Sequence, residues 1–207
     1  MRKLKEIYGL PLYILRHPFD GFYKMKFGHE GRMGTAFINF ILLWVSVSFM
    51  SQYASITVAT PFPLAHNSLA DGASLFGLLV LWSLANWSVT SLTNGEGKFK
   101  EIFMANCYAM TPLVLTLVPV TLLSHGLTDT EGAFFFMIVT VAVIWFILLV
   151  YVGMVTVHNF TAGKALRTVF LTFVAMLIIV FLGTLLIVLL QQMYSFGVSI
   201  YTELAYR

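Results

Sequence analysis

The sequence predicts an all-α fold, an integral membrane bundle of five transmembrane helices preceded by short interfacial amphipathic helices. Of the 207 residues, 59% are hydrophobic and only 10% are charged, whereas soluble domains carry about 25% charged residues. The mean hydropathy is +0.87. Because the chain lacks the polar side chains that a water-facing surface needs, its composition indicates a single membrane domain.

After Arg32, charged residues become sparse and separate long uncharged runs. Each run exceeds the roughly 20 residues that a helix needs to cross about 30 Å of hydrocarbon. We expect prolines within 60–63 to end the first helix and leave an exposed loop over about 58–70. In the third helix we expect kinks at Pro112 and Pro119. The five transmembrane helices are therefore expected near residues 34–57, 72–93, 101–124, 133–157 and 166–192.

The amino-terminal segment, residues 1–32, is basic and precedes the transmembrane domain of residues 33–207. Apolar residues alternate with lysine and arginine, which favours a short helix in the headgroup plane, interrupted by Pro11. After a turn at residues 17–22 we expect a second short interfacial helix. A disordered tail is the alternative, but the apolar residues are too frequent for it. The candidate interfacial residues are Pro18, Gly21 and Phe22.

Lysine and arginine are distributed unevenly between the two ends of the predicted helices. Seven of the twelve lie in the first 32 residues, two lie in the loop near residues 94–100, and two lie near residues 158–167. Only Arg207 lies on the other side. Because basic residues favour the cytoplasmic side, we expect a multi-pass protein of the plasma membrane with a cytoplasmic amino terminus and an extracytoplasmic carboxyl terminus.

The most polar stretch within the membrane domain joins the second and third transmembrane helices. Residues 94–98 are expected to form a tight turn, because Asn-Gly and Gly-x-Gly favour positive φ. Ser83, Asn86 and Thr90 share one face of the preceding helix. The candidate site residues of this hairpin are Asn86, Thr90, Asn94, Gly95, Gly97, Asn106, Tyr108, Thr111 and Pro112.

Two interpretations of these polar residues stay open. In the structural one, amides and hydroxyls form hydrogen bonds across the hairpin, each contributing about 0.6–2 kcal/mol. In the functional one, they form a hydrophilic groove at the cytoplasmic leaflet that admits a lipid headgroup or a helix of a partner. We favour the structural interpretation.

The residue types exclude several function classes. Cys107 is the single cysteine, so there is no internal disulfide and no cysteine-based metal motif. The five histidines have no ligand spacing, so we expect neither a metal nor another cofactor. No charged residue lies in the middle of a predicted span, which argues against an ion-coupled pump. Hydrolase and nucleotide-binding motifs are missing, and the basic residues are too dispersed for nucleic acid. The sequence thus predicts a non-enzymatic protein.

Several short motifs follow one another in a recognisable order. They are Pro18-x-x-Gly21-Phe22, the turn Gly95-Glu96-Gly97 with Phe99, the run from Tyr108 to Pro112, and His158 followed by Lys164-Ala165-Leu166. Together they resemble the Yip family of Rab-interacting five-span membrane proteins, in particular its bacterial branch, over roughly residues 10–190. The resemblance implies a non-enzymatic protein that works with partners. The long acidic or proline-rich amino-terminal region of eukaryotic members is missing, which argues against binding a Rab-type GTPase.

For the function we expect an accessory or scaffold subunit that binds another integral membrane protein, such as a transporter component, or itself. The alternative is a lipid-handling protein, either a scramblase or a membrane-shaping protein. In both cases the lipid bilayer surrounds the chain. Aromatic residues near the carboxyl end, from Tyr194 to Tyr206, are expected to anchor a long fifth helix at the outer interface.

Overall fold

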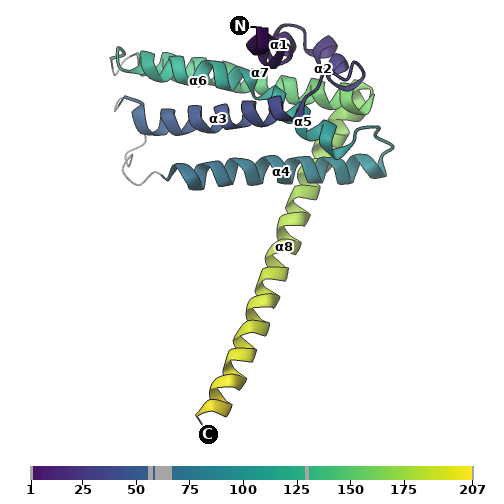
Figure 1. Ribbon diagram of the computed structural model, residues 1–207, viewed down its shortest axis with the longest axis vertical. Helices are drawn as coiled ribbons and strands as arrows, with labels where there is room; N and C mark the ends of the chain where they lie inside the picture. The colour runs from purple at the N-terminus through teal and green to yellow at the C-terminus, as the bar shows by residue number, and fades with distance from the viewer. Residues whose placement is uncertain (1, 56–57, 59–66, 129–130, 207) are drawn as a thin grey trace.

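The computed structural model is helical throughout the elements that it describes (Figure 1). It describes residues 2–55, 58, 67–128 and 131–206, with side chains from Gly9 onward. The helices are α1 (Arg2–Arg16), α2 (Pro18–Lys26), α3 (Met33–Tyr53), α4 (Ser68–Leu92), α5 (Phe99–Ala109), α6 (Thr111–Ser124), α7 (Gly132–His158) and α8 (Ala162–Ala205). Among the described residues, five helical segments are long and apolar enough to cross a membrane, with α5 and α6 together forming one of them. The predicted fold class is therefore confirmed.

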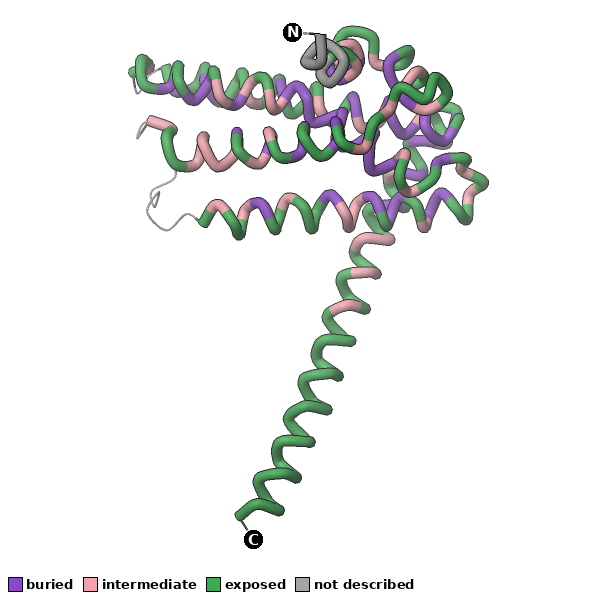
Figure 2. The backbone as a smooth tube through the Cα atoms, in the orientation of Figure 1, coloured by how far each residue is buried: buried purple, intermediate pink, exposed green. Residues whose placement is uncertain are grey.

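The core of the bundle surrounds α5. Every residue from Ile102 to Ala109 is buried, and α5 packs against α3, α4 and α7. In Figure 2 the buried residues gather around α5 and the adjoining ends of α4 and α7. Helices α3, α4 and α6 run alongside one another, whereas α8 leaves them obliquely (Figure 1). The polar hairpin residues therefore lie at the best-packed end of the molecule.

The two amino-terminal helices differ from the prediction in where they break. Pro11 was expected to interrupt the first helix, but α1 continues through it. Pro11 and Ile14 are both buried on the same side of α1, so packing offsets the backbone hydrogen bond that proline cannot make. The break occurs at His17, because the residue before a proline disfavours helical backbone. Pro18 then begins α2 directly, at a position where proline is well tolerated.

Two transmembrane helices end at positions that differ from those expected, and α4 begins at Ser68 rather than near residue 72. The first ends at Tyr53 rather than near residue 57, and the proline-containing part of the loop expected after it, residues 59–66, lies outside the described residues. The fifth was expected to end near residue 192, but α8 contains 44 residues and ends at Ala205. Since no proline occurs between Ala162 and Ala205, the chain offers no strong helix breaker there.

Candidate functional site

The turn at the centre of the predicted hairpin lies against the end of α7. Asn94 adopts the left-handed conformation, with φ of 54°. The glycines were expected to supply positive φ, but no described glycine does so. They are needed for space instead. A Cβ on Gly95 would lie 2.7 Å from His158 Nδ1, and one on Gly97 would lie 2.6 Å from His158 Cε1.

His158 is the last residue of α7, and it connects three segments of the chain. The Gly97 N–H donates to His158 Nδ1 at 3.3 Å, and His158 Nε2 lies 3.1 Å from Asn86 Oδ1. Because Nδ1 accepts a hydrogen bond, the proton of the neutral ring is assigned to Nε2, which donates to Asn86. Asn86 Nδ2 in turn donates to Thr172 Oγ1 of α8 at 3.3 Å. We call His158, Asn86 and Thr172 the histidine network.

The neighbouring hairpin residues also bond within the bundle. Thr90, predicted to share a face with Asn86, is buried, and its hydroxyl donates to the Asn86 carbonyl at 2.8 Å. Asn106 of α5 donates to Ser83 Oγ of α4 at 3.2 Å. The predicted polar face of Ser83, Asn86 and Thr90 is therefore confirmed, and all three residues are buried.

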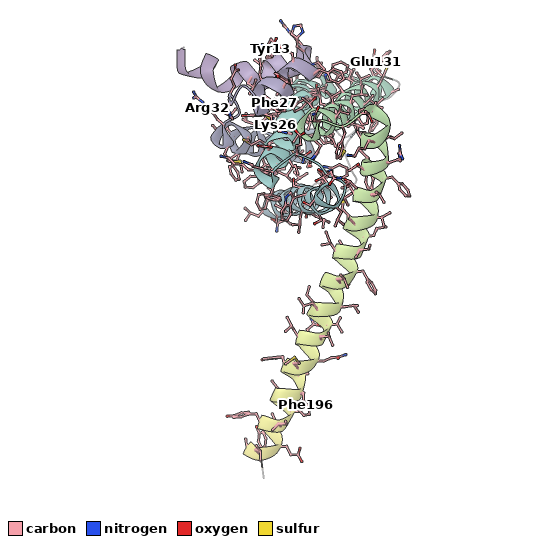
Figure 3. The ribbon with its side chains drawn as sticks, turned by 90° about the vertical axis from the view of Figure 1, so that its right-hand side faces the viewer. Tyr13, Lys26, Phe27, Arg32, Glu131 and Phe196 are labelled. Atoms are coloured by element: carbon pink, nitrogen blue, oxygen red, sulfur yellow. The ribbon has the colours of Figure 1, made fainter. Side chains whose placement is uncertain are left out.

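Lys26 at the end of α2 connects the amino-terminal segment to this site through polar contacts. Its ammonium group donates to the Val157 carbonyl at 2.8 Å and lies 3.6 Å from Glu96 Oε2 of the turn. A cation there stabilises the last carbonyls of α7, where the helix dipole is negative. Lys26 also lies 4.6 Å from the ring centre of Phe27, which neighbours it in Figure 3.

The break between α5 and α6 forms a second polar cluster. Pro112 has no N–H, so the Tyr108 carbonyl loses its ordinary helical donor, and the Thr111 hydroxyl donates to it at 2.6 Å. Asn39 of α3 donates to the Cys107 carbonyl at 2.5 Å and to Thr111 Oγ1 at 3.3 Å. The Thr111 hydroxyl thus satisfies the carbonyl that the proline frees, as buried backbone in a membrane requires, and the Cys107 carbonyl also accepts from the Met110 N–H at 3.3 Å. Near Pro112, where a kink was expected, the helix breaks between α5 and α6, whereas α6 continues through Pro119.

The remaining candidate residues position the amino-terminal segment. The Tyr108 hydroxyl donates to the Arg32 carbonyl at 2.9 Å and accepts from the Arg32 N–H at 3.0 Å, which holds the start of α3. Gly21 leaves room for Ile14 of α1, since a Cβ there would lie 2.5 Å from Ile14 Cγ1. Phe22 is fully buried and packs on Gly153 of α7. Pro18, the third candidate interfacial residue, begins α2.

The open space at the hairpin is small. A cavity of about 10 Å³ lies between α4, α5 and α7, lined by Trp82, Asn86, Asn106, Gly153 and His158 among others. That is room for about one water molecule. A larger groove of about 280 Å³ lies away from the hairpin, between α3 and α4, and is lined by Val47, Ser51, Asp71, Ser74, Leu75 and Leu78. The polar hairpin residues therefore leave no space for a lipid headgroup in this structure.

Sequence reasoning missed His158, Asn39, Thr172 and Lys26 as members of these clusters. His158 is 72 residues from Asn86, and Asn39 is 68 residues from Cys107, so no local pattern joins them. The two glycines of the turn could have indicated that another segment packs there, because closely spaced glycines permit the close approach of another segment. The described residues include no group of three histidine, cysteine, aspartate or glutamate side chains placed to hold a metal ion.

Comparison with known proteins gives one finding. A family model described as the Yip1 domain matches residues 12–201. The matched range begins within α1 and ends within α8, so it contains every candidate site residue. No curated protein and no solved structure matches the chain significantly.

Proposed function

The chain belongs to the Yip1 domain family of multi-pass membrane proteins, and from this premise we propose that it is an accessory or scaffold subunit that binds another integral membrane protein. Yip1 family members are generally non-enzymatic membrane proteins. A transporter component is the kind of partner that we favour. We place the chain in the plasma membrane, and the uneven distribution of lysine and arginine supports a cytoplasmic amino terminus.

The main support for this proposal is the exposed middle of α8. From Phe173 to Leu190, no residue of α8 is buried and none is charged, and Figure 2 shows this part of the helix outside the bundle. Nothing lies within 4 Å of a Cβ built on Gly183. A small residue on an exposed transmembrane face lets a second helix approach closely, which is how helices associate in lipid. An apolar helix of another membrane protein fits this surface.

The hairpin gives less support to the lipid-handling alternative. A scramblase needs a polar path wide enough for a headgroup, but Asn86, Asn106 and His158 are hydrogen-bonded inside the bundle. The space between them is about 10 Å³. These contacts favour the interpretation of the hairpin as a packing element, and they leave α8 as the surface for a partner.

The test is photo-cross-linking in native membranes, followed by purification in mild detergent and mass spectrometry. A photoreactive residue replaces Leu177, which is 73% exposed on α8, and the matched control replaces Leu79, which is 4% exposed inside the bundle. We expect Leu177 to give an adduct with one other membrane protein, and Leu79 to give none. Adducts with lipid alone, or with a second copy alone, would contradict the accessory function.

A further inference from the structure

The last turns of α8, Gln191–Ala205, differ from the rest of that helix. Between Phe173 and Leu190 the only polar side chain is Thr184. Beyond Leu190, polar residues recur with helical spacing, and at 3.6 residues per turn they fall within about 120° of the helix circumference. These polar residues are Gln191, Gln192, Ser195, Ser199, Thr202 and Glu203. We call this segment the carboxyl-terminal amphipathic segment.

The opposite face of the segment is apolar and has no contact with the bundle. Met193, Tyr201 and Leu204 are 71%, 74% and 70% exposed. Phe196 stands near the free end of α8, far from the other helices (Figure 3). In water this face would be a contiguous apolar surface of the kind that marks a membrane or protein contact.

The length of α8 places the segment at a membrane surface. The 23 residues 168–190, which carry no charge, extend about 35 Å at 1.5 Å per residue, and the hydrocarbon core is about 30 Å thick. At the usual tilt of about 20° from the bilayer normal, the helix has therefore crossed the core before Gln191. A helix standing upright would carry the following 15 residues about 22 Å into water. In that position the apolar face would lie in water, so we expect this part of α8 to bend towards the headgroups in a bilayer.

The composition of the polar face indicates which surface the segment suits. Glu203 is its only charged residue, and the others are glutamine, serine or threonine. Surface helices that depend on anionic lipid carry lysine and arginine on the polar face. Here the binding energy must come from burying the apolar face, and Tyr194 and Tyr201 are suited to the headgroup level.

We propose that Gln191–Ala205 is a lipid-surface-binding segment, which lies in the headgroup region of the leaflet opposite to α1 and α2. Its apolar face is buried at the acyl-chain boundary, its polar face meets water, and binding needs no anionic lipid. The proposal concerns α8 beyond the spanning part and does not depend on the partner proposed for Phe173–Leu190.

The experiment uses the full chain reconstituted in lipid vesicles, in a Cys107→Ala background that removes the single cysteine. A fluorophore is attached in turn to Ser199→Cys on the polar face and to Tyr201→Cys, which is about 200° further round the helix. Fluorescence is quenched from water with iodide and from the bilayer with a nitroxide lipid. Ser195→Cys and Met193→Cys repeat the comparison one turn earlier, so that no result depends on one substitution.

We expect nitroxide lipid to quench the Tyr201 label several-fold more than the Ser199 label, and iodide to show the reverse order. The contrast should be the same in pure phosphatidylcholine and with 30% phosphatidylserine. Equal iodide quenching at both sites would show a segment that stands in water, and protection from both quenchers would show a protein contact. Either result would overturn the proposal, as would a contrast that appears only with phosphatidylserine.

Discussion

At the scale of single residues, close contact rather than backbone conformation explains the glycines of the turn. Gly95 and Gly97 both face the ring of His158, and Asn94 alone supplies the left-handed backbone. The ring occupies the volume that side chains at these two positions would need. The turn and the histidine network are therefore packed together, although Gly97 and His158 are 61 residues apart in the sequence.

We predict that Gly97→Ala destabilises the protein by about 1–3 kcal/mol, the usual cost of adding a methyl group to a packed site. The new Cβ would lie 2.6 Å from His158 Cε1 and 2.8 Å from Val157 Cγ1. Gly77→Ala is the control, since nothing lies within 4 Å of a Cβ there and alanine favours helix. Thermal unfolding in detergent measures both, and equal melting temperatures for the two variants would contradict the close contact.

Replacing Asn86 distinguishes packing from partner binding. Asn86→Ala removes the acceptor of His158 Nε2 and the N–H that donates to Thr172 Oγ1, at a cost of about 1–3 kcal/mol. If the residue serves only packing, unfolding temperature and recovery of a cross-linked partner should fall together. If the variant unfolds at the wild-type temperature but no longer yields the cross-linked partner, Asn86 would instead have a role in binding. Ser88→Ala, on an exposed hydroxyl bonded to its own helix, should change neither.

At the scale of helices, the break between α5 and α6 couples two distant residues. Pro112 interrupts the helix, and at the break the Cys107 carbonyl accepts from the Asn39 side chain as well as from the Met110 N–H. We predict that Asn39→Ala costs about 1–3 kcal/mol in the wild type and less in a Pro112→Ala background, where the continuous helix can supply its own donors. A double-mutant cycle on unfolding free energy measures the coupling. Strictly additive effects would disprove it.

The contact between α1 and α2 should depend on pH. The Tyr13 hydroxyl donates to Asp20, and the Lys24 ammonium group lies 2.9 Å from the same carboxylate. In that order of importance, they hold the pKa of Asp20 below its ordinary value of 3.8. Because the folded pKa is lowered, the stabilisation is present above pH 3.8 and is lost as the pH falls through the lowered value.

Asp20→Asn is the comparison for this pH dependence. We expect the wild type to melt at a higher temperature than the variant near pH 6, and the difference to shrink as the pH falls below about 3.8. Because Asp20 is exposed, the difference should also decrease in high salt. A difference that grows on acidification would contradict the assigned contacts.

At the scale of the whole molecule, we propose that five spans place the amino-terminal segment and the end of α8 on opposite sides of the membrane. Gly163 and Gly126 are exposed near opposite ends of α7, and Cys107 is buried. With a membrane-impermeant maleimide, we expect Gly126→Cys to react in intact cells and Gly163→Cys only after permeabilisation. The reverse pattern would invert the proposed orientation, and reaction of both from one side would contradict five spans.

The sequence alone determined the number and approximate position of the spans, because a helix that crosses lipid needs a long uncharged run, and such a run is a local property. It also identified the polar face of Ser83, Asn86 and Thr90, since residues three and four apart share a side of a helix. The interruption at Pro112 was predictable for the same reason, because proline acts on its own turn of helix.

Only the tertiary structure decided which polar groups meet. His158 joins Asn86 and Gly97 across separations of 72 and 61 residues, and Asn39 joins Cys107 across 68. Such pairs depend on which helices pack together and in which register, and no pattern within one helix contains that information. The direction of α8 could not be predicted from the sequence either. Its spanning part is apolar on every side, so its residues do not indicate which side faces protein and which faces lipid.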